Sequence, residues 1–253
     1  MMIGKRYNAR PLAADPARAR ALSRLDWLRV RDDESGGDVL GGRQQWFEDK
    51  YRRLRGCGPV AAANIAAYLA RQGQLVSLYL PYLETPRAAG YIDPDHVFEH
   101  GAFTQHMRAV WHYVTPGLLG LPSTEAFADG LRRYAREHGV GLDVEAYPVK
   151  FTHRRNRRSF RRLIQFISEG LEADIPVAFL NHSAGQVREI ESWHWVIITG
   201  IEVNHDESQA EVRVADAGVE KTFSLDRWFY TSRLGGGFVR LANPRSLYLA
   251  TGG

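Results

Sequence analysis

Residues 55–70 read Arg55-Gly56-Cys57-Gly58-Pro59-Val60-Ala61-Ala62-Ala63-Asn64-Ile65-Ala66-Ala67-Tyr68-Leu69-Ala70, and they hold the single cysteine of the 253-residue chain. Glycine stands on both sides of Cys57, and Pro59 has the fixed φ and the missing N–H donor that suit a first helical position. Apolar residues then occupy nearly every face, and many are alanines small enough for neighbouring elements to approach closely. The stretch therefore predicts a buried central helix that begins just after the cysteine.

Cys57 has two possible roles at this position. A thiol at the N-terminus of a helix is reactive, because unpaired N–H groups and the positive end of the helix dipole favour a thiolate and can hold an oxyanion. The alternative is a small buried apolar side chain, since free cysteines are among the most buried residues. A packing cysteine needs neither flanking glycines nor the first position of a helix. The setting therefore favours Cys57 as a nucleophile.

A histidine and an aspartate follow on two segments that alternate like strands. His194 shares one face of a predicted strand at 193–203 with alternate apolar residues, and Asp216 ends a similar strand at 210–216. If the two strands form a hairpin with a tight turn centred on His205, His194 lies directly opposite Asp216. A longer loop would shift this register, and Asp216 would then be an ordinary turn residue. We predict the paired arrangement, which places a carboxylate beside an imidazole.

Three motifs in this order carry a resemblance to a known family. They are Gly56–Ala63 with its following helix, Ser192–Gly200, and Val214–Gly218. Together they resemble the papain-like cysteine peptidases, most closely the bacterial C39-like branch. The resemblance implies that Cys57 is the nucleophile, that His194 is its general base and that Asp216 orients the imidazole.

The resemblance also implies an oxyanion-hole glutamine shortly before the cysteine. Tyr51 stands at the matching place, so the nearest glutamines, Gln44 and Gln45, become the candidate donors. Two tryptophans are candidates to line the substrate cleft, Trp46 beside these glutamines and Trp193 beside the histidine. Trp46 is equally consistent with a place in the core.

The spacing of apolar residues predicts an α+β protein. Helices are expected at 15–31, 75–83, 103–114, 124–138 and 158–170, and strands at 142–147, 175–180, 193–203, 210–216, 219–224, 238–241 and 246–250. We expect one papain-like domain over 1–253, in which a nucleophile-bearing helix packs on an antiparallel β-sheet. Its mainly helical half, 56–140, includes a helical insertion lobe, and its β-rich half is 141–253. The cleft then lies between the halves.

Composition narrows the class of protein. With 44% hydrophobic and 25% charged residues the chain has ordinary globular composition. No stretch of 18 apolar residues occurs and the N-terminus lacks the pattern of a signal peptide, so we expect a cytoplasmic protein with no membrane partner. A bacterial source is what the resemblance to the C39-like branch implies. One cysteine excludes an internal disulfide, and a reducing compartment would keep its thiol usable.

The positive charge is local. The formal net charge is +4, yet residues 153–162 contain six arginines and no acidic residue. Such a run is a nucleic-acid patch, a site for acidic partners or a solvated helix face. Phe160 is its one aromatic residue, so the run lacks the stacking platforms of single-strand binders. We predict a solvated face and no nucleic-acid partner.

The sequence contains a second candidate site. His96, Glu99 and His100 match the His-x-x-Glu-His pattern of inverted zinc metallopeptidases. Five letters recur by chance and no downstream ligand can be named, so a helix start is the preferred interpretation and no metal or cofactor is expected.

The favoured function is a peptidase or amidase that cleaves a peptide or amide bond through Cys57, His194 and Asp216 and a thioacyl intermediate. The same triad serves acyltransferases and transpeptidases. A zinc hydrolase and a non-catalytic binding module with an arginine-rich face remain as alternatives from other classes. Thiol labelling, metal analysis and salt-dependent binding discriminate among them.

Overall fold

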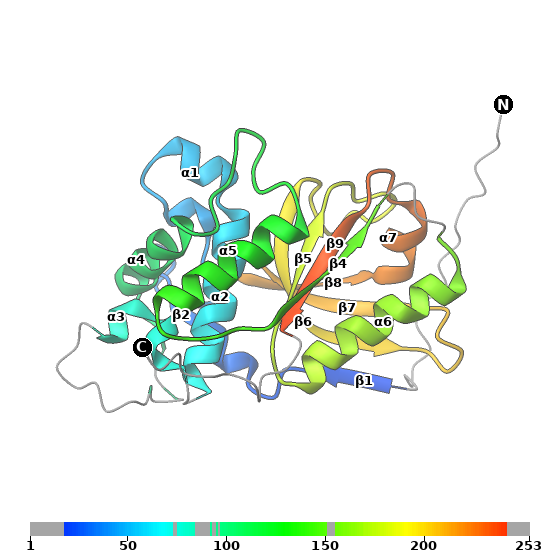
Figure 1. Ribbon diagram of the computed structural model, residues 1–253, viewed down its shortest axis with the longest axis horizontal. Coiled ribbons are helices and arrows are strands. Elements are labelled where there is room, and N and C mark those ends of the chain that lie inside the picture. Colours follow the sequence, from blue (N-terminus) through cyan, green and yellow to red (C-terminus); the bar gives the residue numbers. More distant parts are fainter. Residues whose placement is uncertain are drawn as a thin grey trace.

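The computed structural model describes residues 18–72, 75–83, 92, 95, 97–150 and 155–241. Its helices are α1 (Lys50–Arg55), α2 (Cys57–Arg71), α3 (Leu80–Leu83), α4 (His100–Trp111), α5 (Thr124–Glu137), α6 (Arg157–Glu172) and α7 (Leu225–Thr231). Its strands are β1 (Arg18–Ala21), β2 (Arg29–Arg31), β3 (Asp38–Leu40), β4 (Val144–Val149), β5 (Val177–Asn181), β6 (His194–Val203), β7 (Ala210–Asp216), β8 (Val219–Ser224) and β9 (Gly236–Leu241). In Figure 1 the helices α1 to α5 gather at one side and the sheet, with α6 and α7, at the other.

Seven strands form one antiparallel sheet in the order β4-β9-β5-β6-β7-β8, with β1 paired to β6. Strands β5 and β6 lie at its centre and are buried along nearly their whole length. Helix α6 packs on the face that carries Val177, since a Cβ on Gly170 would approach that side chain to 2.5 Å. The opposite face carries Trp195, whose ring stacks on Phe127 of α5 at 4.5 Å. The sheet is therefore covered on both faces, and this explains the near-continuous apolar runs of its central strands.

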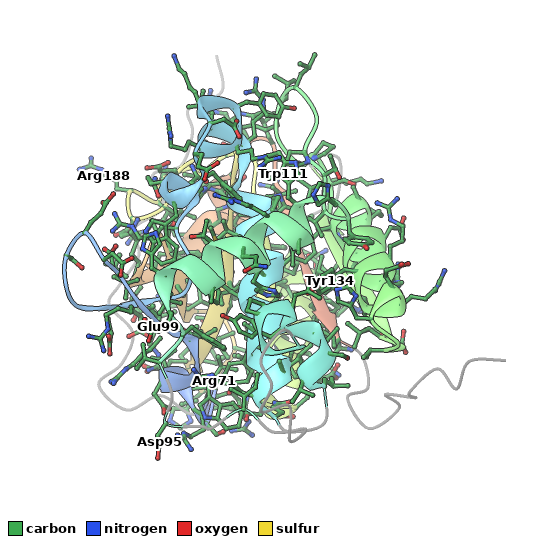
Figure 2. The ribbon with its side chains drawn as sticks, turned by 90° about the vertical axis from the view of Figure 1, so that its left-hand side faces the viewer. Arg71, Asp95, Glu99, Trp111, Tyr134 and Arg188 are labelled. Atoms are coloured by element: carbon green, nitrogen blue, oxygen red, sulfur yellow. The ribbon has the colours of Figure 1, made fainter. Side chains whose placement is uncertain are left out.

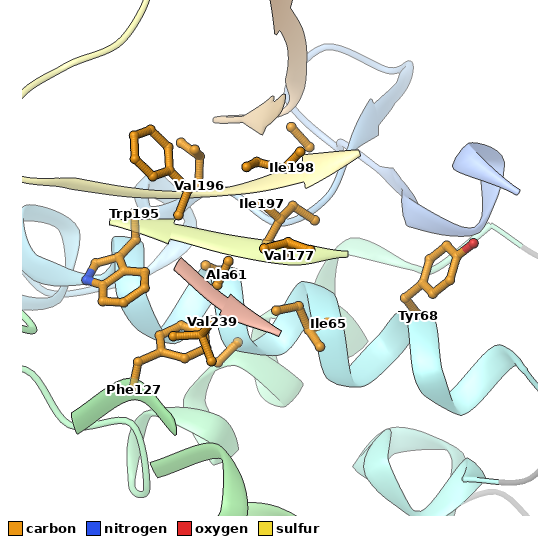
Figure 3. Close-up of a cluster of buried hydrophobic side chains, with 14 of the residues drawn as sticks. Ala61, Ile65, Tyr68, Phe127, Val177, Trp195, Val196, Ile197, Ile198 and Val239 are labelled. Atoms are coloured by element: carbon orange, nitrogen blue, oxygen red, sulfur yellow. The ribbon is translucent and has the colours of Figure 1, made fainter. Parts of the chain in front are cut away.

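Helix α2 is buried on every side, as its sequence predicts. All of its residues from Cys57 to Arg71 are buried, and it packs against β5 and β6 on one side and against α4 on another. Ala61 and Ile65 lie along the side of α2 that faces the strands in Figure 3. Alanine leaves room for the two backbones to approach, because a larger side chain would overfill the interface.

Helix α4 packs against α2 on the side away from the sheet, which Figure 2 shows facing the viewer, whereas α5 contacts α2 and also the strands β4 and β9. Buried His106 of α4 lies with its Nε2 atom 3.1 Å from the Ala63 carbonyl of α2, and burial lowers the pKa of this imidazole to about 4. Tyr134 of α5 donates a hydrogen bond of 2.9 Å to the Leu78 carbonyl. The His106 contact ties α4 directly to the nucleophile-bearing helix.

The predicted α+β architecture, with a central helix on an antiparallel sheet, is confirmed. The helix predicted at 15–31 is wrong over its described part, which forms β1, a 3-10 turn at Leu25–Leu28 and β2. The reason is tertiary: β6 extends beyond β5, and Arg18–Ala21 pairs with its free edge from Val203 to Gly200. The start of that predicted helix and the strand predicted at 246–250 lie outside the described residues. Helices α1 and α7 and strand β3 were not predicted.

Within the part of the chain that the structure describes, no helix is both long enough and apolar enough to cross a membrane.

Candidate active site

Cys57 is the first residue of α2, 9% exposed, and it lines a cavity of about 80 Å³ together with His194 and Asp216. The flanking glycines allow close packing around the sulfur. A Cβ on Gly56 would come within 2.6 Å of the Phe47 ring, and one on Gly58 within 2.9 Å of the Leu121 side chain. The Gly-Cys-Gly motif therefore positions the thiol where no larger neighbour would fit.

Three side chains form a chain of polar contacts in the cavity that Cys57 lines. The Nε2 atom of His194 lies 2.6 Å from Oδ1 of Asp216, and Lys221 donates a hydrogen bond of 2.7 Å to Oδ2 of the same carboxylate. The side chain of Asp216 is 3% exposed, whereas that of Lys221 is 33% exposed. The side chain of Cys57 lines the same cavity as His194 and contributes to the raised pKa of the imidazole. The carboxylate thus holds the ring in the cavity that also contains the thiol.

The electrostatics of this chain favour a protonated imidazole. Burial alone would lower the pKa of His194, but hydrogen bonds and negative charge at Asp216 and Cys57 raise it from 6.5 to about 10. Burial alone would raise the pKa of the Asp216 carboxyl, but the hydrogen bonds and charges of His194 and Lys221 hold it below its usual value. At neutral pH the site therefore contains a carboxylate beside an imidazolium.

The shift in the pKa of His194 links protonation to folding. Because the pKa of the folded state, about 10, lies above the unbonded value of 6.5, the protonated imidazole stabilises the folded state fully below pH 6.5. This contribution is lost as the pH rises through about 10. For Asp216 the sign is opposite, since its pKa is lowered, so its contribution is present above pH 3.8 and disappears as the carboxylate is protonated in acid.

The strand pairing that brings His194 to Asp216 differs from the predicted one. The loop between β6 and β7 runs from Asn204 to Gln209 and is closed by a hydrogen bond of 3.2 Å between these residues, so it is longer than a tight turn centred on His205. The prediction that His194 lies directly opposite Asp216 is therefore wrong. The two side chains meet diagonally instead, which cross-strand neighbours can do.

A β-bulge in β6 makes the diagonal contact possible. On the loop side Gly200 pairs with Arg213, and this register alone would set Asp216 on the face away from His194. The register shifts between Ile198 and Gly200, so that one extra residue, Thr199, is accommodated. A shift of one residue exchanges the faces of a strand, and the carboxylate returns to the face of the histidine.

Lys221 was not singled out from the sequence, although a signal for it exists. Asp216 pairs with Val219 across the turn at Ala217 and Gly218, so Lys221 lies two residues further along the same face of β8. A tight hairpin at Asp216-Ala217-Gly218-Val219 would have placed the ammonium within reach of the carboxylate. The lysine makes the carboxylate a bridge between two cations.

Gln44 and Gln45 both line the cavity of Cys57, as the candidate oxyanion donors should. They lie in a 3-10 turn, Gln44–Trp46, and α1 stands between this turn and the nucleophile. The intervening helix explains why the spacing seen in related peptidases fails here and why Tyr51, on α1, is not a donor in this cavity. Gln44 is half-buried, and among the described residues its amide oxygen has no hydrogen-bond partner, whereas Gln45 is exposed.

Asn64 is a second residue that the sequence analysis missed. It lies two turns after Cys57, is 4% exposed, and accepts a hydrogen bond of 2.8 Å from the backbone N–H of Gly42. A Cβ on Gly41, which has a φ of +81°, would come within 2.7 Å of the Asn64 amide. This bond ties the segment that leads to Gln44 directly to the helix that carries the thiol.

The two tryptophans predicted to line the cleft lie in different environments. Trp46 is 7% exposed and packs against His100, with 4.5 Å between ring centroids, and against Phe103. It belongs to the core and lines neither of the cavities that include Cys57. Trp193 is 56% exposed and lines the second of these cavities, which opens beside the thiol.

The zinc pattern falls partly outside the described residues, because His96 is not among them. The ring of His100 stacks on Trp46, and its Nδ1 atom accepts a hydrogen bond of 3.4 Å from the backbone of Asp33. Among the residues that the structure describes, no cluster of three or more His, Cys, Asp or Glu side chains is arranged to hold a metal ion.

The arginine run lies on and just before α6, and Arg154 lies outside the described residues. Arg155 is half-buried and hydrogen-bonded to the Ser232 carbonyl. Arg161 is exposed, donates to the Asp206 carbonyl and pairs with Glu207. Part of the charge is therefore matched within the chain, and the solvated-face interpretation stays a prediction.

Comparisons with known proteins do not identify a family for this chain, so the kind of site is argued from its geometry alone. No protein-family model matches the chain, and no curated protein matches it. Among solved structures, UfSP from C. elegans is similar, with a TM-score of 0.47 and 10% sequence identity over 89% of this chain and 34% of that chain. This chain thus spans about a third of the length of UfSP, and a likeness this low transfers no function.

The arrangement itself defines a class. The cysteine opens a central helix, and the histidine and aspartate come from the antiparallel sheet on which that helix packs. A site of this class brings a thiol, an imidazole and a carboxylate together, which are the groups that nucleophilic catalysis by cysteine requires.

We predict that Asp216→Asn lowers the pKa of His194 by about 1–3 units, because the amide keeps the shape of the carboxylate and removes its charge. Lys221→Met is the matched control. Loss of the ammonium leaves the negative charge of Asp216 uncompensated, so this variant must not lower the pKa of His194. An NMR pH titration of the imidazole proton, assigned with His194→Gln, measures both. Unchanged titration in Asp216→Asn would mean that the carboxylate does not act on the ring.

Proposed function

We propose that the protein is a cysteine peptidase or amidase in which Cys57, His194 and Asp216 form the catalytic triad. The observation that carries the proposal is the contact of 2.6 Å between the buried carboxylate of Asp216 and the imidazole of His194, in a cavity that Cys57 also lines. The three residues come from segments far apart in the sequence, so their meeting in one cavity is a property of the fold. The motif resemblance supports the bacterial C39-like branch as the finer assignment.

The first chemical step follows from the protonation of His194. An imidazolium beside Cys57 favours a thiolate, and the thiolate attacks the carbonyl carbon of the substrate. A carbon–sulfur bond forms and the carbonyl electron pair moves to oxygen. When the oxyanion collapses, the carbon–nitrogen bond breaks and His194 gives its proton to the leaving amine. A thioester on Cys57 and a free amine result.

The second step regenerates the enzyme. Neutral His194 takes a proton from water, the hydroxide attacks the thioester, and the carbon–sulfur bond breaks to release the acid and the thiolate. Asp216 holds the ring in the tautomer that this exchange requires and stabilises the imidazolium that forms. An amine acceptor in place of water would make the same machinery an acyltransferase.

An activated acyl donor tests the proposal. We expect a peptide p-nitrophenyl ester to give a burst of nitrophenol and a mass increase on Cys57 equal to the acyl group. Cys57→Ala abolishes both, and His194→Ala slows acylation by about 10³-fold or more. His205→Ala, which removes an exposed histidine from the β6–β7 loop, is the matched control and keeps the wild-type rate.

Two outcomes would contradict the proposal. Acylation at the wild-type rate in Cys57→Ala would show that Cys57 is not the nucleophile. Full activity in His194→Ala would show that another residue acts as the base. Product analysis with and without added glycinamide then separates hydrolysis, which gives the free acid, from transfer, which gives the amide.

The oxyanion donor yields a separate prediction. Gln44 lines the cavity and is more buried than Gln45, so we expect its amide N–H to be the donor and Gln44→Ala to lower kcat by about 10²–10³-fold with little change in KM. Exposed Gln45 is its matched neighbour, and Gln45→Ala should lower kcat by less than about fivefold. The reverse order of effects in steady-state kinetics would transfer the role to Gln45.

A further inference from the structure

A second cavity opens at Cys57 on the side away from the glutamines. Its volume is about 500 Å³, and it is lined mainly by leucines and tryptophans. We call its walls the leucine groove: Leu54, Leu118, Leu119, Leu121, Leu180, Trp193 and Trp195. The volume is within the range of pockets that bind ligands, and Cys57 is part of its lining.

Four of the seven residues that form the leucine groove are exposed to an unusual degree. Leu118 is 79% exposed and Leu119 is 85% exposed, while Leu54 and Trp193 are 64% and 56% exposed. These are four of the seven large apolar side chains that are exposed in the described part of the chain. Single exposed apolar residues need no explanation, but a cluster beside a reactive thiol marks a binding surface.

The exposed leucines are held in place by backbone contacts. Gly117 and Gly120 exchange two backbone hydrogen bonds of 3.0 and 3.1 Å, which close the turn that carries Leu118 and Leu119. The guanidinium of Arg55 donates to the Leu118 carbonyl at 2.5 Å. The turn is therefore fastened to the end of α1, two residues before the nucleophile.

Trp193 has a left-handed backbone conformation, which residues other than glycine rarely adopt. Its φ is +57°, and its ring lies against His182, with 4.9 Å between centroids. Such strain costs on the order of 1–3 kcal/mol and persists where the surroundings require it. Here it directs a large ring into the leucine groove directly before the catalytic candidate His194.

We propose that the leucine groove binds large apolar side chains on the acyl side of a polypeptide substrate, next to the carbonyl that Cys57 attacks. This inference rests on the proposed function, because it assigns a substrate class to the same nucleophile. Leucine- or phenylalanine-sized side chains match the chemistry of the walls, and their burial against Leu118 and Leu119 removes apolar surface of both partners from water. Substrates with small or charged residues there lose this stabilisation.

A polypeptide fits the leucine groove better than a long alkyl chain does. Leu118 and Leu119 remain largely open to water, so the groove is a channel with one open side and not an enclosed tunnel. An alkyl chain laid along it would stay half-wetted throughout its length. Side chains enter such a groove one at a time while the peptide backbone remains solvated, which satisfies its polar groups.

Chloromethyl ketone probes test the substrate class on the full-length protein. We expect acetyl-Leu-Leu to label Cys57 about 10–100-fold faster than acetyl-Ala-Ala, measured as the second-order rate by intact mass spectrometry. In the double variant Leu118→Ser/Leu119→Ser this ratio falls to about one to three. Leu234→Ser, which changes a leucine that is 51% exposed and outside the groove, keeps the wild-type ratio.

Iodoacetamide labelling in parallel separates the possible failures. Equal rates for the two peptide probes, with rapid iodoacetamide labelling, overturn the leucine groove and leave the thiol hydrolase standing. An octanoyl chloromethyl ketone that labels faster than acetyl-Leu-Leu assigns the groove to alkyl chains and overturns the polypeptide. Absence of labelling by every probe overturns both proposals. A selectivity that survives in the double variant places the apolar recognition elsewhere.

Discussion

The burial of helix α2 on all sides is the constraint on which the rest of the structure depends. Its alanines allow β5 and β6 to approach from one side and α4 from another, and this contact fixes the point at which Cys57 emerges. The glycines around the cysteine let Phe47 and Leu121 close over the same end of the helix. The leucine groove and the small cavity then open on either side of one thiol, so fold, nucleophile and substrate surface share a single origin.

Charge links the sheet to this helix end. The ammonium of Lys221, the carboxylate of Asp216 and the imidazole of His194 alternate in sign, and burial of the carboxylate strengthens both contacts because little water screens them. The pKa of His194, raised to about 10, makes the ring a proton donor before a substrate arrives. The positive charge of Lys221 partly offsets the attraction between the Asp216 carboxylate and the His194 imidazole. The lysine therefore adjusts the pKa of His194 in a way that the histidine and aspartate alone could not.

The sequence predicted the central helix with Cys57 at its start and most strands, because local periodicity and the Gly-Cys-Gly-Pro motif decide them. It failed where tertiary contacts decide: Arg18–Ala21 is a strand because β6 offers an edge, and Trp46 is in the core because α4 covers it. The contact of His194 with Asp216 was predicted for the wrong reason. A longer loop and the bulge at Thr199 shift the register twice, and only the structure shows that the shifts restore the same face.

The central claim is that the fold converts Cys57 into a nucleophile. The most direct test is the rate of alkylation by iodoacetamide at pH 6, measured on the folded protein and on the protein in urea. An ordinary thiol has a pKa of about 8.5 and is almost entirely protonated at that pH, so the unfolded chain should react slowly. We predict that folded Cys57 reacts at least about tenfold faster, in spite of its burial, and that His194→Ala removes the difference. Equal or slower reaction of the folded protein would contradict it.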